Sequence, residues 1–173
     1  MPGQELYKAW PAMDDATKDH YVSKIADICH DLAKWQYDSI CGVDGRSMLD
    51  EYPSTKPPTP DCLSPPRIIQ SCEAMGMDVS SPFVFYHGDL GPSNILIDLE
   101  NKDYIGIIDW ESAGYVPRDW VRSKFRVSDD MDAPKVDWRD MTDPKEWRKR
   151  VQLRLEEMGY KDVVDGFFKF GTD

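Results

Sequence analysis

The chain has 173 residues, of which 40% are hydrophobic and 31% are charged, and its formal net charge at pH 7 is -11. This length is sufficient for one domain with a sizeable core, and hydrophobic patterns of both helical and strand type predict an α+β fold. The excess of carboxylates disfavours binding to nucleic acids or to anionic membranes, because phosphate groups would be repelled over most of the surface.

The composition also restricts the compartment and the metal chemistry. The four cysteines have neither the CxxC spacing of a zinc site nor the density of a disulfide scaffold. Reduced thiols in a cytoplasmic protein are therefore the simplest interpretation. We recognise no signal peptide, transmembrane run or internal repeat in the sequence, so no membrane association is expected.

The first long periodic segment runs from Asp14 to Tyr37 and predicts a helix. Its apolar residues recur at alternating steps of four and three, which is typical of one buried stripe. The stripe consists of Tyr21, Ile25, Ile28, Leu32 and Trp35. His20 and His30 lie on or beside this helix, where a solvated or packed histidine is more frequent than a ligand or a base.

Prolines interrupt the chain from Pro53 to Pro66, so residues 53–66 are predicted to form an irregular surface loop. A Pro-x-x-Pro recognition segment is the alternative, although a plain connection is the more frequent use of such a stretch. A short helix is expected from Arg67 to Met75, and Gly76 is expected to end it.

A polar loop lies between predicted strands in the middle of the chain. Phe83 to Tyr86 and Ile95 to Ile97 have the β-branched and aromatic composition of strands, and a third strand is predicted from Tyr104 to Ile108. The second and third strands are separated by the polar residues 98–103, which predicts an antiparallel hairpin. The loop between the first and second strands carries His87, Asp89 and Asn94.

The hairpin predicts a site for a hard metal ion. If its turn is centred near Asn101 and Lys102, antiparallel pairing places Asn94 and Asp109 roughly opposite each other, with Cβ atoms about 5 Å apart. One amide oxygen and one carboxylate, with water and phosphate completing the shell, suit Mg²⁺ bound to a nucleotide. The alternative is that Asp89, Asn94 and Asp109 are merely turn, strand-end and cap residues, for which all three types are common.

The last third of the chain is predicted to be mainly helical. Gly114 to Pro117 should break the chain before a helix that extends to about Arg126, and a second helix should start at Asp143 with an N-cap, a first-turn proline and the capping-box residue Glu146. The buried face of this second helix is predicted to be Trp147, Val151, Leu155 and Met158, and the pairs Val163-Val164 and Phe167-Phe168 are expected in the core. Between the two helices, residues 128–143 are acidic, with Asp129, Asp130, Asp132, Asp137 and Asp140.

The central residues resemble a known family. His87-Gly88-Asp89-Leu90-Gly91-Pro92-Ser93-Asn94 is similar to the HxDxxxxN loop of the aminoglycoside phosphotransferase and choline kinase family, and Ile107-Ile108-Asp109-Trp110-Glu111 is similar to its IDWE segment. The resemblance implies a catalytic role for Asp89, which orients or deprotonates an acceptor hydroxyl. It also implies that Asn94 and Asp109 hold magnesium and bind the ATP cofactor through it, whereas His87 is structural.

The resemblance extends to the start of the sequence. Met1 to Leu6 resembles the stretch that follows the interlobe hinge in this family, and no glycine-rich phosphate loop can be identified. We therefore expect residues 1–173 to form the mainly helical C-terminal lobe of a protein-kinase-like fold, with the N-terminal lobe absent. The surface that such a lobe would cover is expected to be apolar and to favour self-association.

Two functions from different classes are consistent with these patterns. The first is transfer of the γ-phosphate of ATP to a hydroxyl of a small molecule, when an N-terminal lobe complements the chain. The acidic segment 128–143 would favour a cationic acceptor, although a solvated loop is the more frequent role of such a run. The second is a solitary lobe without kinase activity, which serves as a binding or interaction module or as a repurposed biosynthetic enzyme.

Overall fold

Helices and two small sheets form the structure, a computed structural model that describes residues 3–48, 63–80, 82–136 and 142–170. The α+β class predicted from the sequence is confirmed. In chain order the elements are β1 (Gln4–Glu5), α1 (Leu6–Ala9), η1 (Trp10–Ala12), α2 (Asp15–Leu32), β2 (Gln36–Tyr37), β3 (Cys41–Gly42), α3 (Pro65–Ala74), β4 (Phe83–Tyr86), β5 (Ile95–Ile97), β6 (Ile105–Ile107), η2 (Trp110–Ser112), β7 (Gly114–Val116), α4 (Arg118–Val127), η3 (Asp129–Met131), α5 (Glu146–Glu157) and α6 (Val164–Phe170).

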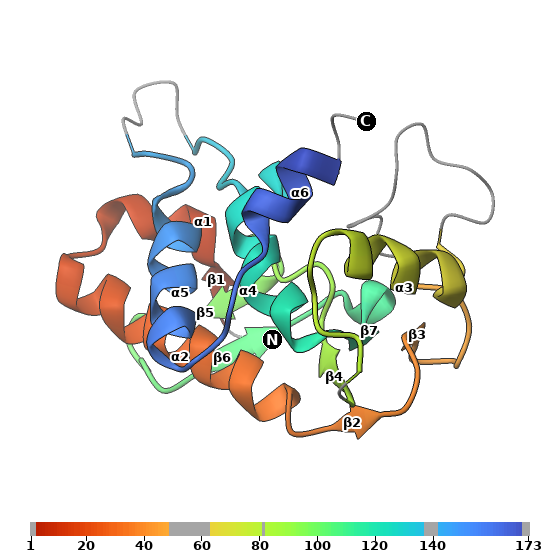
Figure 1. Ribbon diagram of the computed structural model, residues 1–173. Coiled ribbons are helices and arrows are strands. Elements are labelled where there is room, and N and C mark those ends of the chain that lie inside the picture. Colours follow the sequence, from red (N-terminus) through yellow and green to blue (C-terminus); the bar gives the residue numbers. More distant parts are fainter. Residues whose placement is uncertain (1–2, 49–62, 81, 137–141, 171–173) are drawn as a thin grey trace.

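The two sheets are both antiparallel and lie near the middle of the molecule (Figure 1). One has the strand order β1-β5-β6 and contains the predicted hairpin, and the other has the order β2-β4-β7-β3. The polar loop leaves the second sheet at the end of β4 and enters the first sheet at β5. The residues predicted to carry chemistry therefore connect the two sheets.

The strand β7 corrects one prediction. A chain break was predicted at Gly114 to Pro117, but Gly114–Val116 pairs with β4 on one side and with β3 on the other. The glycine allows the close approach, because a Cβ at this position would overlap with the carbonyl oxygen of Cys41 in β3. Pro117 then occupies the N-cap of α4, next to the first-turn position predicted for it.

The helix α2 begins as its sequence predicts and ends earlier. The Asp14 carboxylate accepts a hydrogen bond from the Thr17 amide at 2.8 Å, which satisfies one of the free N–H groups of the first turn. The helix ends at Leu32 instead of Tyr37, because the chain turns and continues as β2.

This earlier end changes which side chains are buried. Tyr21 and Ile25 lie in the core as predicted, but Trp35 is 62% exposed, so its assignment to the core is wrong. Beyond Ile25 the buried stripe passes through Cys29 to Ala33, one position away from the predicted line. Trp35 belongs to a different surface, described below.

The main core lies where α2 and α4 pack against α5. The rings of Phe125 and Trp147 meet edge to face with their centroids 5.8 Å apart, and the Trp147 indole N–H donates to the Met131 carbonyl at 2.7 Å. The burial predicted for Trp147, Val151 and Leu155 is confirmed.

The last predicted core residues have mixed outcomes. Val164 is buried, whereas Phe168 is 63% exposed, so its assignment to the core is wrong. The Phe167 side chain lies outside the described part of the structure, as does most of the proline-rich loop 53–66.

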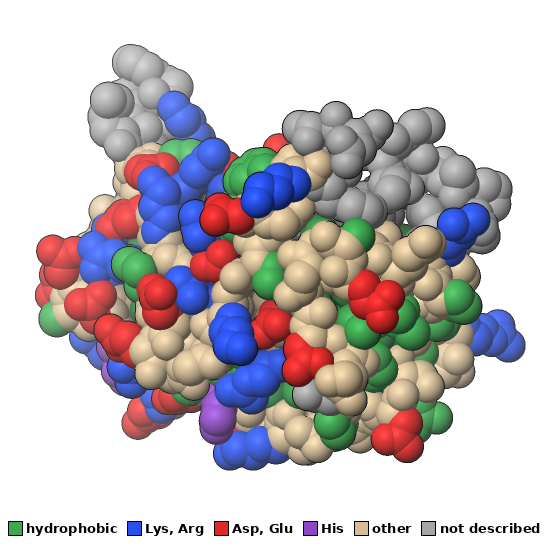
Figure 2. All heavy atoms as spheres, viewed as in Figure 1, with side chains coloured by type: hydrophobic (Ala, Val, Ile, Leu, Met, Phe, Trp, Pro, Cys, Tyr) green, Lys and Arg blue, Asp and Glu red, His purple; other side chains and the backbone are tan. Residues whose placement is uncertain are grey.

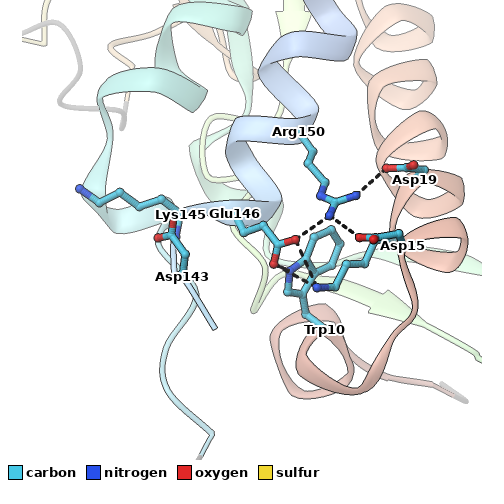
Figure 3. Close-up of polar contacts among 8 residues, drawn as sticks. Trp10, Asp15, Asp19, Asp143, Lys145, Glu146 and Arg150 are labelled. Carbon is cyan, nitrogen blue, oxygen red and sulfur yellow. Dashed lines mark hydrogen bonds and ion pairs between the residues drawn. The ribbon is translucent and has the colours of Figure 1, made fainter. Parts of the chain in front are cut away.

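A network of charged groups joins α2 to the start of α5 (Figure 3). The Arg150 guanidinium lies 2.6 Å from the Asp15 carboxylate, 2.8 Å from Asp19 and 2.7 Å from Glu146. Glu146 also accepts hydrogen bonds from the Trp10 indole at 3.1 Å and from Lys18 at 3.0 Å. Burial by itself raises the pKa of Glu146, but these hydrogen bonds outweigh burial and hold the pKa below its usual value.

The capping box predicted for α5 is not formed. The N-cap is Lys145, and no side chain caps the helix there. Asp143 accepts instead from the Lys145 amide at 2.9 Å, and the Glu146 carboxylate is engaged by the network with α2. A tertiary contact has therefore replaced the local one.

The surface is uneven in character (Figure 2). Charged side chains of both signs crowd the side built by α2 and α5, whereas hydrophobic side chains are more frequent on the side of α3 and β7. Within the described ranges, no helix combines the length and the apolar composition needed to cross a bilayer.

Candidate active site

The polar loop begins at Gly88 with a backbone conformation that requires glycine. Its φ is +86°, and a Cβ at this position would clash with the Ser112 carbonyl oxygen. The strand β4 ends just before this glycine and is buried along its whole length. The loop therefore starts from a fixed point, packed directly against the segment that follows Asp109.

Asp89 and Asn94, which the sequence predicts to act together, are in direct contact. The Asn94 side-chain amide nitrogen lies 2.9 Å from the Asp89 carboxylate oxygen Oδ2 and 2.9 Å from the Asp89 carbonyl oxygen. Both hydrogen bonds close the loop on itself, and the one to Oδ2 restricts rotation of the Asp89 side chain. Because the amide nitrogen is used in this way, the Asn94 amide oxygen is left to face another group.

The position of Asp109 differs from the prediction by one residue. In the hairpin, Ile95 pairs with Ile107 and Ile97 with Ile105, so Asn94 faces Ile108. The Ile108 amide donates to the Asn94 carbonyl at 3.0 Å, which confirms this register at the end of the ladder. The prediction that Asn94 and Asp109 lie roughly opposite each other is therefore off by one residue, because Asp109 follows the residue that pairs with Asn94.

The turn explains this register. The Asp98 carboxylate accepts from the amides of Glu100 at 2.9 Å and Asn101 at 3.2 Å, and the Tyr104 amide donates to the Asn101 carbonyl at 2.9 Å. The turn is therefore centred on Asn101 and not between Asn101 and Lys102. Such a shift exchanges the partner of every residue in the hairpin.

Asp109 has an unusual backbone conformation, with φ 63° and ψ 63°. In the described part of the chain it is the one non-glycine residue with a positive φ. Aspartate tolerates the left-handed region better than most residues, but the conformation still costs free energy and persists only where its surroundings enforce it. Its side chain is exposed at the point where β6 ends.

His87 fixes the backbone immediately before Asp109. Its ring is fully buried, and its Nε2 lies 2.9 Å from the Ile108 carbonyl oxygen, so Nε2 must carry the hydrogen. Burial lowers the pKa of His87, although the hydrogen bond to Ile108 and the carboxylates of Asp89 and Asp109 act in the opposite direction. A neutral ring that holds the Ile108 peptide in place fits the structural role expected for His87.

Lys124 is a further residue of the site that the sequence predictions did not include. It belongs to α4, is 7% exposed, and its ammonium donates a hydrogen bond to the Gly88 carbonyl. The available signal was its position in the helix, since Lys124 falls on the apolar stripe formed by Trp120, Val121 and Phe125. A lysine on such a stripe indicates a buried ammonium that needs acceptors.

The hairpin is held in place by α2. The Tyr21 hydroxyl donates to the Asp98 carbonyl at 2.8 Å, and the Lys24 ammonium pairs with Asp103 at 3.0 Å. His20 contacts the Lys102 carbonyl at 3.0 Å, which gives this histidine a structural contact, as the sequence predicts. These contacts fix the turn of the hairpin against α2. The opposite end of the hairpin, next to Asn94 and Asp109, is therefore held in a defined orientation.

The acidic segment 128–143 is only partly available for a ligand. Asp132 is paired with Arg148 at 2.5 Å, and Asp143 is paired with Lys149 at 2.7 Å. Asp129 and Asp130 are exposed, and the Asp130 carbonyl lies near the polar loop, 3.8 Å from where a Cβ on Gly91 would stand. Asp137 and Asp140 lie outside the described residues.

The donor set around the loop fits magnesium better than a softer metal. Within the described residues, no group of three or more His, Cys, Asp and Glu side chains could hold a metal ion. A magnesium site does not need such a group, because one or two oxygen ligands from the protein, completed by water and phosphate, are sufficient. The Asn94 amide oxygen and the Asp109 carboxylate are the groups that could serve.

The comparisons with known proteins bear on the family of the chain. The model of a family described as the phosphotransferase enzyme family (APH) matches residues 1–120, a range that contains Asp89, Asn94 and Asp109. No curated protein and no solved structure gives a significant match. Because the matched range is more than half of the chain, the protein belongs to the phosphotransferase enzyme family.

Proposed function

We propose that the chain is the catalytic-loop lobe of a small-molecule kinase, which transfers the γ-phosphate of ATP to a hydroxyl group. The observation that carries the proposal is the direct contact between Asp89 and Asn94 in a loop whose neighbouring segment holds Asp109 in a strained conformation. Phosphoryl transfer depends on positioning and on neutralising charge, and a rigid pair of this kind supplies positioning.

Asp89 is proposed to act on the acceptor. Its Oδ2 is engaged by the Asn94 amide, so Oδ1 is the oxygen that can accept the hydrogen of an acceptor hydroxyl and orient its oxygen for attack. Asn94 Oδ1 and the Asp109 carboxylate are proposed to hold Mg²⁺, which offsets the negative charge of the phosphates when bound. Lys124 and His87 then act on the backbone of Gly88 and Ile108, and not on the reacting groups.

The acceptor is proposed to be a hydroxyl-bearing cation. Asp129 and Asp130 are exposed, and the Asp130 backbone lies near Gly91 of the polar loop, whereas Asp132 and Asp143 are already paired with basic side chains. A small surface depression elsewhere is less suitable for a cation, because Lys135 is its charged lining residue. Tyr7, Trp10, Pro11, Ala133, Pro134, Thr142 and Pro144 complete its lining.

The nucleotide part of the proposal can be tested by NMR even if binding is weak. The ¹⁵N-labelled chain is titrated with MgATP to millimolar concentration, and the amide signals of Asn94 and Asp109 are expected to shift. Asn94→Ala and Asp109→Ala should each abolish the shifts, whereas Asp89→Ala should retain them because its proposed contact is to the acceptor. A lack of shifts in the unaltered chain would contradict the proposed nucleotide site.

The acceptor part requires a separate measurement. Phosphorus NMR can follow ATP consumption with hydroxyl-bearing amines, neutral polyols and hydroxy acids. The amines are expected to react best, and Asp129→Asn combined with Asp130→Asn should raise KM for amines while leaving KM for polyols unchanged. Glu157→Gln, an exposed carboxylate on α5, is the matched control. A preference for hydroxy acids would refute the cationic acceptor but not the kinase assignment.

A further inference from the structure

Aromatic rings in mutual contact cover one face of the second sheet, next to the candidate active site. Phe85 is the central ring, with Trp35 at 5.6 Å, Tyr115 at 5.4 Å and Trp110 at 6.3 Å between centroids. Tyr37 extends the group through Tyr115, at 5.2 Å. We call these five residues the aromatic face.

The aromatic face lies at the edge of the main core. Phe85 is outside the core cluster, although the other three residues of β4 belong to it and Tyr115 packs against it. Phe85 is nevertheless only 8% exposed, because the other rings cover it. The outer rings have no comparable cover, and the exposed fractions are 62% for Trp35, 52% for Tyr37 and 39% for Trp110.

This degree of exposure is informative because the rings adjoin one another. Single exposed apolar side chains are normal, but contiguous ones mark interaction sites. Tryptophan and tyrosine are also the residues that contribute most to binding energy at protein interfaces, since they bury a large area with few rotatable bonds. The rings come from β4, β7, β2, η2 and the turn between α2 and β2, so the surface is wider than a single side chain or small ligand needs.

The charges beside the aromatic face are mainly negative. Asp38 follows Tyr37, and Asp109 and Glu111 flank Trp110; all three carboxylates are exposed. The nearby cations are already paired within their own segments, Lys34 with Asp31 at 2.6 Å and Arg46 with Asp44 at 3.8 Å. A second copy of a chain with a net charge of -11 would therefore meet like charge at this surface.

We propose that the aromatic face binds a polypeptide segment in which basic side chains alternate with apolar ones. Apolar side chains would pack on the exposed rings, and arginine or lysine would pair with Asp38 or Glu111 and stack on a tryptophan face. The Trp110 ring packs on His87 with centroids 4.6 Å apart. A segment bound to Trp110 would therefore lie close to the histidine that holds the backbone of the candidate active site. The proposal does not depend on nucleotide binding.

Synthetic repeat peptides provide the probe. A peptide of arginine-leucine repeats is titrated into the whole chain, and binding is followed by calorimetry. Arginine-serine repeats are a control that carries the positive charge without the apolar groups. Glutamate-leucine repeats are a control that carries the apolar groups with negative charge. The arginine-leucine peptide is expected to bind about tenfold or more tightly than either control, and to bind more weakly as salt is added.

A double variant locates the binding surface. Trp35→Ser combined with Tyr37→Ser should weaken binding of the arginine-leucine peptide about tenfold or more, and both side chains are exposed enough that the fold should be retained. Leu153→Ser, which changes an apolar side chain 53% exposed on α5, should leave binding unchanged. Unfolding by urea verifies that the variants remain folded.

Three results would overturn the proposal. Equal binding of the arginine-leucine and arginine-serine peptides, or equal binding by the double variant and the unaltered chain, would show that net charge alone attracts the probe. Sedimentation that reveals self-association of the unaltered chain, abolished in the double variant, would assign the aromatic face to a second copy of the chain instead.

Discussion

At the scale of single residues, the candidate site is held by backbone contacts from buried side chains. His87 contacts the Ile108 carbonyl and Lys124 contacts the Gly88 carbonyl, so the two segments that carry Asp89 and Asp109 are each fixed one residue before the carboxylate. The carboxylates themselves are half-buried and exposed, respectively. The arrangement separates the groups that impose geometry from those that face a ligand.

The left-handed conformation of Asp109 predicts an unusual order of stability. Asp109→Gly should be more stable than Asp109→Ala by about 1 kcal/mol, because glycine adopts a positive φ without the clash that an alanine Cβ suffers. Urea denaturation of both variants measures the difference. At Glu111, two residues later and without a positive φ, the same pair of substitutions should give the opposite order. Alanine as the better residue at position 109 would show that no strain is stored there.

Lys124 is expected to contribute to both stability and local order. Lys124→Met should lower the free energy of unfolding by about 1.5 to 3 kcal/mol, because the buried Gly88 carbonyl loses a charged donor. Hydrogen exchange should become faster in the loop 87–94 before it does so in α2 or α5. Lys149→Met, which removes an exposed ammonium paired with Asp143, should change stability by less than about 0.5 kcal/mol. Uniformly faster exchange throughout the chain would argue against a specific tie to the loop.

At the scale of secondary-structure elements, α2 has two functions in the structure. One side of it contacts the hairpin turn through Tyr21 and Lys24, and its first turns meet α5 through Asp15 and Asp19 (Figure 3). The helix therefore couples the end of the hairpin to the C-terminal helices. Arg150 and Glu146 each have three partners in this junction, and the carboxylate neighbours of Arg150 raise its pKa.

The junction predicts an acid-sensitive contribution to stability from Glu146. Its pKa is lowered in the folded chain, so its stabilising effect is complete above the unfolded pKa of about 4.3 and is lost as the pH falls through the folded value. Glu146→Gln should therefore lower the free energy of unfolding by about 1 to 3 kcal/mol at pH 7. The difference between the two proteins should shrink below about pH 4.

Chemical denaturation at a series of pH values measures this effect. Glu157→Gln is the matched control, because this glutamate lies on the same helix but pairs with Arg154 in an exposed position. Its effect should stay within about 0.5 kcal/mol at every pH. A Glu146→Gln difference that does not change with pH would mean that packing, and not charge, sets the contribution of this residue.

At the scale of the whole molecule, the candidate site and the aromatic face lie on adjoining surfaces. The polar loop connects the two sheets, Trp110 follows Asp109 directly, and the Trp110 ring stacks on Phe85 of the second sheet. Ligand binding at one surface and polypeptide binding at the other would therefore share the segment 109–112. This proximity favours coupling between the two.

The whole chain is expected to bind MgATP only weakly. Asn94 and Asp109 are candidate oxygen ligands for the metal, but the 173 residues contain no recognisable glycine-rich phosphate loop. Titration calorimetry should give a dissociation constant weaker than roughly 100 μM, which corresponds to less than about 5.5 kcal/mol of binding free energy. Binding in the low-micromolar range would show that residues within this chain supply the missing phosphate contacts.

The sequence by itself determined the features that depend on local patterns. The α+β class, the strands β4 and β5, the start of α2 and the buried face of α5 all follow from periodicity and from residue types at turns and caps. The candidate residues Asp89, Asn94 and Asp109 were also identified from spacing and resemblance alone. Their catalytic and metal-binding roles remain predictions.

The tertiary structure decided what no local pattern contains. The hairpin register depends on how the Asp98 carboxylate organises the turn, and β7 exists because distant strands lie on both sides of it. Trp35 is exposed because α2 ends at Leu32, and Lys124 is buried because its acceptor on Gly88 lies in another part of the chain. In each case the deciding contact joins residues whose proximity is set by folding, and sequence spacing carries no information about it.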